Sequence, residues 1–440
     1  MRFLQVDLST RGSRHGAATH RYLLKIGFAL ILPLLAAPAA HAAADVNTRP
    51  LSLTEAVKLA DTQSPAITAR QAAAESAESA IEPAGALPDP QLVAGVDNLP
   101  VTTGDAFSLT RDFMTMRKIG VMQEFPRGEK RHLRTERAQA TAAREQALLI
   151  SEQLSVREGV ARAWIVRATA ERRLLLLHEL EPRAKVQVAA ATAALSAGRA
   201  SAADGIAAKS AQALLADRIS QAEREVEVAR AEFARWLPDD AERSLGDAPN
   251  WSELGVDPDS LVANAAHHRE LLAYDAAEQF ATTEVSLARA EKRPDWSVEF
   301  DYAQRGPAYS KMISLEFRIG LPIFAAHRQD PTIASKQAAL AQIEAEREDA
   351  RRMHIALLRK AVATWRSARD RVQRYECELL PLANDRADAA LAAYRGGRGD
   401  LQASLTALDQ AIDQRIAYTE LQDVLGQSWA TLHFAFPKER

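Results

Sequence analysis

The stretch WSVEFDYAQRGPAYSKMISLEFRIGL, residues 296–321, decides the fold class because it contains two alternating segments separated by a turn. Successive strand residues point to opposite faces, so each segment predicts a strand with one apolar face and one polar face. We expect these strands at about 295–303 and 311–321. The apolar faces hold Trp296, Val298, Phe300, Tyr302, Ile313, Leu315, Phe317 and Ile319.

The first half of the chain carries a weaker version of this pattern. Leu92, Ala94 and Val96 occupy every second position of a segment expected as a strand at about 91–98, and a further strand is expected at about 117–125. Alternation also occurs in soluble sheets with one wet face, so the pattern alone does not identify the surroundings.

The two halves share a series of motifs in one order. Pro88-Asp89 recurs 206 residues later as Pro294-Asp295, and Trp164 recurs as Trp365. Residues 124–126 recur 196 residues later at 320–322, and the tip motif 195–199 recurs at 394–398. Repeated order of this kind indicates a duplicated architecture. The expected organisation is a first repeat at 45–237, a linker or equatorial segment at 238–258 and a second repeat at 259–436.

Most of the remaining sequence is helical in composition. Aromatic residues make up only 6 %, and Ala, Arg, Glu, Leu and Gln dominate long segments. The helices expected in the two repeats lie at about 52–82, 128–197, 201–236, 260–292, 328–395 and 400–433. A helix of about 70 residues is a rod on the order of 100 Å long, which favours coiled-coil packing over a globular core. Pro182 and Pro381 predict a local bend in each rod.

The N-terminus has the features of a secretory signal peptide, expected at residues 1–44. Basic residues precede an apolar run from Leu23 to Ala40, and a small-x-small site follows. Cleavage there would remove five Lys or Arg and one Asp and change the formal net charge from −3 to −7, which disfavours a nucleic-acid partner.

Cys377 is the only cysteine, so no intrachain disulfide is expected, and we expect it to be a small buried helix residue.

An exported chain with such strands must satisfy their backbone groups if the apolar faces meet lipid. An open sheet cannot do so in a bilayer, and four strands are too few for a known membrane barrel. Copies of the chain are therefore expected to pool their strands, eight from a dimer or twelve from a trimer. The trimer is favoured because only the wider barrel leaves an aqueous lumen for the charged faces.

On these residues the sequence resembles the TolC-like outer membrane factors, and within them the CzcC-type members of heavy-metal efflux pumps. The resemblance covers essentially the whole chain after residue 44. It is carried by the duplicated element order, the Leu-Pro-Asp-Pro turn at 87–90 and the two tip motifs, and for the metal branch by the stretch from Asp97 to Gly120.

This resemblance implies an α+β membrane protein: a homotrimer with a twelve-stranded transmembrane β-barrel, four strands per chain, and a long periplasmic α-helical barrel. It also implies a location in the cell outer membrane extending into the periplasm. The implied partners are a periplasmic adaptor protein and an inner-membrane pump of the resistance-nodulation-division class. Cargo would be heavy-metal cations, of the cobalt, zinc and cadmium type or copper and silver, and the subunit would be no enzyme and bind no cofactor.

The resemblance also points to the helix tips. An Asp six residues past the first tip glycine and a Tyr of the second repeat hold the tunnel closed in the family, and Asp204 and Tyr394 occupy those positions. Arg199 and Arg398 are further gate candidates. Gly198 and Gly397, each with the arginine that follows it, are the candidates for adaptor docking.

Other functions remain as alternatives. The channel could serve efflux of organic compounds or type I secretion, and a periplasmic coiled-coil adaptor would also explain the export and the helices. No Ser/His/Asp set, phosphate loop or spaced Cys/His cluster occurs, which argues against an enzyme. His267 and His268 are adjacent and point about 100° apart on a helix, so a shared metal ion is not expected.

Overall fold

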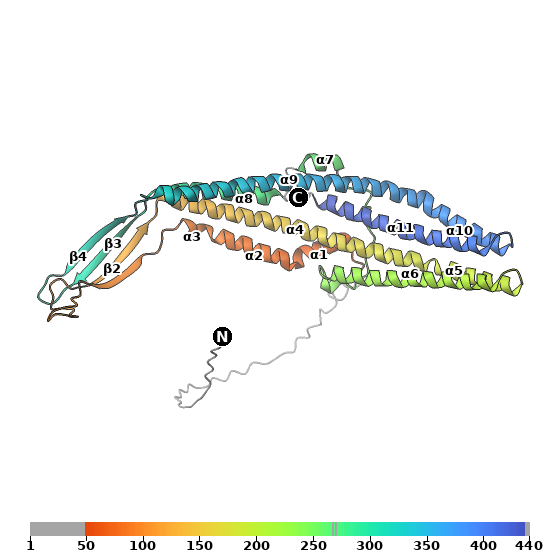
Figure 1. Cartoon of the computed structure of the whole chain (residues 1–440), viewed down its shortest axis with the longest axis horizontal. Helices are drawn as coiled ribbons and strands as arrows, with labels where there is room; N and C mark the ends of the chain where they lie inside the picture. Colours follow the sequence, from red (N-terminus) through yellow and green to blue (C-terminus); the bar gives the residue numbers. More distant parts are fainter. Residues whose placement is uncertain (1–48, 266–267, 269–270, 436–440) are drawn as a thin grey trace, which may run out of the picture. The chain divides into compact units, whose positions relative to one another are not determined.

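The computed structural model describes residues 49–265, 268 and 271–435 of the chain. The expected signal peptide lies outside these residues, as do residues 45–48 of the first expected repeat and residue 436 of the second. Within the described part, helices, a strand hairpin, a long helix, a shorter helix and a final helix follow in that order twice (Figure 1).

The first half contains six α-helices and two strands. Their bounds are α1 Leu53–Gln63, α2 Pro65–Ser79, α3 Ile81–Gly85, β1 Gln91–Asp97, β2 Met116–Phe125, α4 Gly128–His178, α5 Glu181–Ser196 and α6 Ala202–Ala234. Ser52 caps α1, because its side chain accepts a hydrogen bond from the Glu55 amide.

The second half has the corresponding hairpin and long helices. Their bounds are α7 Pro258–Ala263, α8 Leu272–Ala290, β3 Trp296–Gln304, β4 Met312–Ile319, α9 Gln329–Arg374, α10 Leu380–Arg395 and α11 Leu401–Phe434. Short 3₁₀ helices lie at Pro238–Asp240 and Ala325–His327, and a π-helical turn at Tyr375–Leu379 joins α9 to α10.

The long helices differ from the expected single rods. The helix expected at about 128–197 is two helices, α4 and α5, and the helix expected at about 328–395 is interrupted by the π-helical turn. Proline explains both interruptions: Pro182 and Pro381 have no amide hydrogen and stand in the first turn of α5 and α10. Cys377 lies in the π-helical turn and is exposed, so the expectation of a buried thiol was wrong.

The helices expected at about 52–82 and 260–292 are also divided. Ser64 has an extended backbone between α1 and α2, because the residue before Pro65 is kept out of the helical region. In the second half, α7 and α8 are separate helices.

The four strands form one antiparallel sheet in the order β1-β2-β3-β4. β2 and β3 join the two halves, with Phe125 opposite Trp296. β1 and β4 are the edges of the sheet, and each has one side without a strand partner among the described residues.

Helix packing connects the halves. α4 packs against α2, α6, α8 and α11, and α9 packs against α8 and α11 (Figure 1). The largest apolar core among the described residues lies where these helices meet Leu51 and α1, and it contains Trp164, Trp251, Trp365 and Trp429.

Two tryptophans hold this core to the segments that precede the first helix of each half. Trp164 Nε1 donates a hydrogen bond to the Leu51 carbonyl at 3.0 Å, and Trp365 Nε1 donates to the Trp251 carbonyl at 2.9 Å. Trp251 and Leu254, in the segment expected as a linker, are buried. The segment at 238–258 therefore supplies core residues as well as a connection.

Candidate functional site

The first helix tip is built by glycine and by a capping box. Gly198 has φ +67°, which ends α5, and the Arg199 and Gly198 amides bond to the Ala194 and Leu195 carbonyls. This is the Schellman arrangement, and it requires a left-handed residue where glycine has no steric cost. Ser201 then starts α6: its hydroxyl accepts from the Asp204 amide, and the Asp204 carboxylate accepts from the Ser201 amide.

The second tip repeats the same geometry. Gly397 has φ +70°, and the Arg398 and Gly397 amides bond to the Ala393 and Tyr394 carbonyls. Asp400 caps α11, because its side chain accepts from the Ala403 amide at 2.6 Å. Both tips therefore turn the chain back in the same way.

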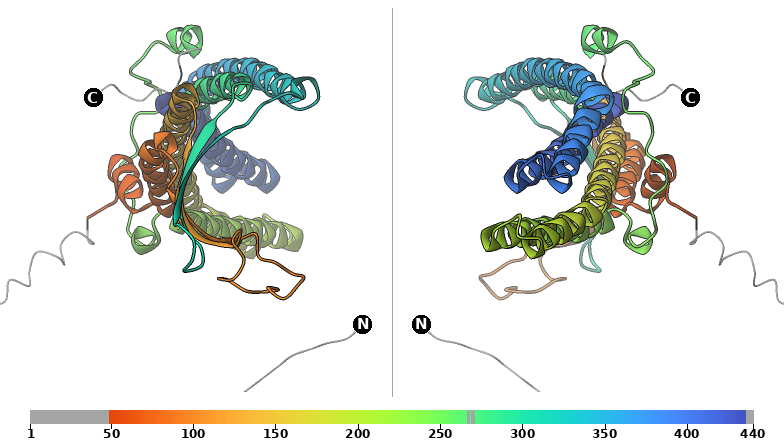
Figure 2. Two further views of the ribbon diagram at one scale, coloured as in Figure 1. Left: turned by 90° about the vertical axis from the view of Figure 1, so that its left-hand side faces the viewer. Right: turned by 90° about the vertical axis from the view of Figure 1, so that its right-hand side faces the viewer.

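The structure brings the two tips together. Ala191 and Ala208 of the first tip pack with Leu401 and Leu405 of the second in one buried cluster. Figure 2 shows the ends of the α5–α6 and α10–α11 pairs side by side. A Cβ placed on Gly397 would lie 3.6 Å from Nη1 of Arg199, so the Arg199 guanidinium lies against the backbone of the second tip.

Tyr394 packs against this cluster with its hydroxyl buried. Among the described residues of this single chain, the hydroxyl has no hydrogen-bond partner. Burial raises the pKa of Tyr394, the nearby Asp204 carboxylate raises the pKa further, and the Arg199 guanidinium opposes both. Tyr394, Asp204 and Arg199 are therefore close enough to interact electrostatically.

Asp204 is engaged within its own turn. One carboxylate oxygen accepts from the Ser201 amide at 2.7 Å and from the Ser201 hydroxyl at 2.8 Å. These bonds to the Ser201 amide and hydroxyl lower the pKa of Asp204. Asp204 thus caps α6, a role that sequence reasoning had not assigned. Arg199 and Arg398 are both exposed.

The sheet presents its apolar face outward. Seven of the eight residues that the alternation placed on this face are 38 to 68 % exposed, and Val298 is half-buried. A contiguous exposed apolar surface of this kind marks a contact with lipid or protein.

Charge gathers on the opposite face of the sheet. Glu299 is only 3 % exposed and lies between two cations, with Lys118 Nζ at 3.9 Å and Arg318 Nη2 at 2.5 Å. Lys118 Nζ also lies 3.4 Å from Asp97 Oδ2 on β1. These ion pairs therefore link side chains of all four strands. Burying a carboxylate without partners is costly, and the two cations offset that cost.

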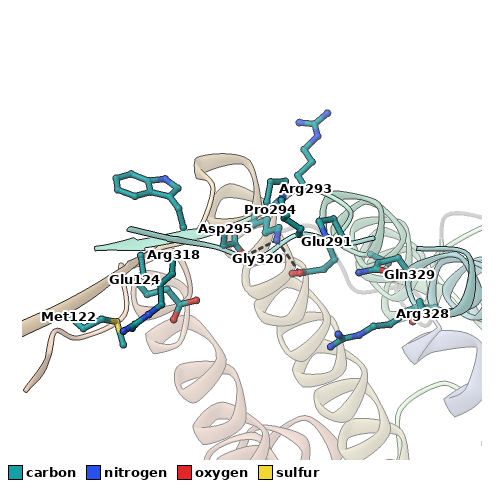
Figure 3. A pocket seen from close by; sticks show the side chains of 17 residues that line it. Met122, Glu124, Glu291, Arg293, Pro294, Asp295, Arg318, Gly320, Arg328 and Gln329 are labelled. Atoms are coloured by element: carbon teal, nitrogen blue, oxygen red, sulfur yellow. Dashed lines mark hydrogen bonds and ion pairs between the residues drawn. The ribbon is translucent and has the colours of Figure 1, made fainter. Parts of the chain in front are cut away.

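An ion-pair site at the base of the sheet was missed by sequence reasoning. Lys130 Nζ, 3 % exposed, lies 2.7 Å from Asp295 Oδ2 and 3.1 Å from Glu291 Oε2. Glu291, Asp295 and Gly320 line a pocket there (Figure 3). The repeated Pro-Asp motif was a signal for Asp295, but the partner lies 165 residues away in the chain.

Asp295 fastens the start of α4 to the start of β3. Its Oδ1 accepts from the Arg127 amide at 3.0 Å, and the Asp295 carbonyl accepts from the Gly320 amide at 3.1 Å. Burial acts to raise the pKa of Asp295, but the bonds from Lys130 and from the Arg127 amide outweigh it and lower the pKa.

The described residues contain no arrangement typical of a metal centre or a membrane helix. No group of three or more His, Cys, Asp or Glu among them could hold a metal ion. His268 is buried with Nδ1 2.5 Å from His354 Nε2, and His267 lies outside the described residues. None of the helices in the described ranges is long and apolar enough to cross a membrane.

Comparison with solved structures identifies the fold. CusC superimposes with a TM-score of 0.73 at 16 % identity, covering 92 % of this chain and 98 % of that one. The outer membrane protein VceC of Vibrio cholerae gives 0.72 at 17 % identity, covering 87 % and 95 %. The Campylobacter jejuni CmeC outer membrane channel gives 0.74 at 13 % identity, covering 88 % and 87 %. No family model and no curated protein matches the sequence.

The chain therefore has the TolC-like fold of long helices and a four-stranded antiparallel sheet. The similarity spans nearly the full length of these structures.

Proposed function

We propose that the chain is the outer membrane channel subunit of a tripartite efflux system. Three copies would pool their sheets into a twelve-stranded barrel and their helices into a periplasmic tunnel, and the subunit would conduct cargo without chemistry. The observation that carries this proposal is the sheet itself: an exposed apolar face, a charged opposite face and two edges that have no strand partner within the described part of the chain.

The fold supports a channel over a periplasmic adaptor. The matched structures include outer membrane channels, and transmembrane channel formation is described for CusC. An adaptor in solution would also leave the outward apolar side chains of β3 and β4 facing water, at a cost of about 25 cal/mol per Å².

The helix tips are proposed as the periplasmic gate and the adaptor-docking site. Both tips expose an arginine directly after a left-handed glycine, and the two tips pack together within one chain. In a symmetric ring each arginine and Asp204 would recur around the axis, where a narrow lumen concentrates their field. A pump of the resistance-nodulation-division class and its adaptor are the proposed partners.

Heavy-metal cations are the proposed cargo, and organic compounds or a type I secretion substrate are the alternative. The metal proposal depends on the resemblance of the stretch from Asp97 to Gly120 to metal-pump channels. In that stretch Met114 is exposed and Met116 is half-buried on β2. Two methionines alone do not define a metal site. We therefore propose that the pump, and not this subunit, selects the cargo.

Fractionation and growth assays test these proposals separately. The full chain should sediment with outer membranes, require detergent for extraction and run as a trimer in light scattering. A monomer that dissolves without detergent would rule out the channel. Deletion should sensitise cells to cobalt, zinc, cadmium, copper or silver; sensitivity only to organic compounds would reject metals as cargo while leaving the channel intact.

A further inference from the structure

We infer that β4 of one copy pairs with β1 of the next in one specific antiparallel register, in which Phe317 lies opposite Ala94 of the partner subunit. This inference rests on the proposed function, because it concerns copies that close one sheet. It goes further by naming which residues meet at the joint between subunits.

The two hairpins obey the same register. β1 residues match β3 residues 206 positions later, and β2 residues match β4 residues 196 positions later. Within the first hairpin Gln91 lies opposite Met122. The corresponding residues of the second hairpin are Ser297 and Arg318, and they also lie opposite each other. The sequence offsets therefore describe the sheet residue by residue.

The joint between the hairpins serves as the template for the joint between subunits. Inside one chain, β2 of the first hairpin pairs with β3 of the second, and Val121 lies opposite Phe300. The next such joint in a closed ring pairs β4 with β1 of the following copy. The residue 196 positions after Val121 is Phe317, and the residue 206 positions before Phe300 is Ala94. The Val121–Phe300 pair inside the chain therefore corresponds to Phe317 paired with the partner subunit's Ala94.

This register keeps the apolar faces together. Phe317 and Leu315, 65 % and 60 % exposed, would lie opposite Ala94 and Val96, which are also exposed. A slip by one residue would turn every side chain of one strand to the wrong face. Only slips by an even number of residues keep the faces matched, and the shortest of these, by two residues in either direction, are the nearest competitors of the proposed register.

The charged face supplies a second observation. At the joint inside the chain, Asp301 lies opposite Gly120, and a Cβ at Gly120 would collide with the Asp301 carboxylate. The inferred joint would again set a carboxylate opposite a glycine, Glu316 opposite the partner's Gly95. Lys118 lies over Gly95 within its own chain, with Cε 3.6 Å from a Cβ placed there, so an ammonium stands beside the place that Glu316 would reach.

One of the two competing slips is disfavoured by charge. A slip that places Phe317 opposite Val96 would also place Glu316 opposite Asp97. Like charges directly opposite on neighbouring strands destabilise the pair unless a cation bridges them, as Arg318 bridges Glu299 and Glu316 inside the chain. The other slip, with Phe317 opposite Leu92, is left to experiment.

Cysteine pairs can measure the register in the full chain in outer membranes. The background variant is Cys377→Ser, which removes the exposed and only native cysteine. The test variant adds Ala94→Cys and Phe317→Cys, and two matched controls combine Phe317→Cys with Leu92→Cys or Val96→Cys. Val121→Cys with Phe300→Cys, opposite each other inside the chain, checks that oxidation works.

The test pair should give cross-linked subunits on non-reducing gels after oxidation with copper phenanthroline. A residue and the one two positions away from its direct partner on the neighbouring strand lie about 7–8 Å apart. Disulfides need Cα atoms about 4.4–6.8 Å apart, so the two controls should give roughly tenfold less product.

The outcomes separate the register from the proposed function. Stronger cross-linking of either control pair, in a protein that is trimeric by light scattering, overturns the register alone. Absence of intersubunit product from all three pairs in such a trimer, while the pair inside the chain oxidises, also overturns it. A protein that is monomeric in detergent overturns the proposed function itself.

Discussion

Nζ of Lys130 and Oδ2 of Asp295 lie 2.7 Å apart, and this ion pair joins the first turn of α4 to the residue that precedes β3. Lys130 is buried, while its second partner, Glu291, is nearly half exposed. The pair connects two segments at the boundary between the helices and the sheet. The contribution of this ion pair to folding stability can be measured by replacing the carboxylate with an uncharged side chain of the same shape.

Asp295→Asn should destabilise the folded chain by about 2 kcal/mol, because a buried ammonium keeps only its half-exposed partner. The asparagine oxygen can still accept from the Arg127 amide, so the change isolates the charge. Urea unfolding in detergent, followed by tryptophan fluorescence, measures the effect. The control Lys130→Met/Asp295→Asn should recover most of the loss; an equally unstable double variant would contradict this account.

The same pair should make stability depend on pH. The pKa of Asp295 is lowered in the folded state, so its contribution is present above the unfolded pKa of about 3.9 and is lost as the pH falls through the folded pKa. The difference in unfolding free energy between wild type and Asp295→Asn should be constant near neutral pH and shrink below about pH 4. Paired urea titrations at pH 7 and pH 3 check this, and an undiminished difference at pH 3 would refute it.

Leu315→Arg should impair assembly, costing about 2 to 4 kcal/mol if residue 315 faces the lipid midplane. Ser314→Arg is the matched control, because Ser314 is adjacent, points to the other face and lies opposite Asp301. The yield of heat-resistant trimer on gels measures the assembly of both variants. Equal yields for the two arginine variants would show that Leu315 does not face lipid.

Asp204→Ala should loosen the closed periplasmic end and raise single-channel conductance in planar bilayers, if the carboxylate accepts a hydrogen bond from Tyr394 in the trimer. The same change removes half of the capping box and so weakens the start of α6. Ser201→Ala is therefore the control, because it weakens the cap and keeps the carboxylate. Equal conductance for these two variants would assign Asp204 to capping alone.

Tyr394→Phe tests the other end of that contact. Within one chain the buried hydroxyl has no partner among the described residues, so its loss should leave chain stability within about 1 kcal/mol of wild type. Conductance should nevertheless rise as it does for Asp204→Ala. Wild-type conductance would remove Tyr394 from the proposed gate.

The alternation from Trp296 to Leu321 was enough to predict the strand faces, because a period of two follows directly from backbone geometry. The shared motifs likewise contained the hairpin register, since the same two offsets relate both hairpins. The tip glycines could also be located from the sequence, because a left-handed turn between helices strongly favours glycine.

Tertiary structure alone decided which distant residues meet. The sequence placed Asp295 in the repeated Pro-Asp motif and Lys130 only within a long expected helix, and folding put them 2.7 Å apart. Folding also brought Arg199 against Gly397 of the other tip. Periodicity and turn chemistry depend on neighbours along the chain, so sequence determines them. Ion pairs and tip contacts depend on how two long helices are aligned, which is set by packing across the whole fold.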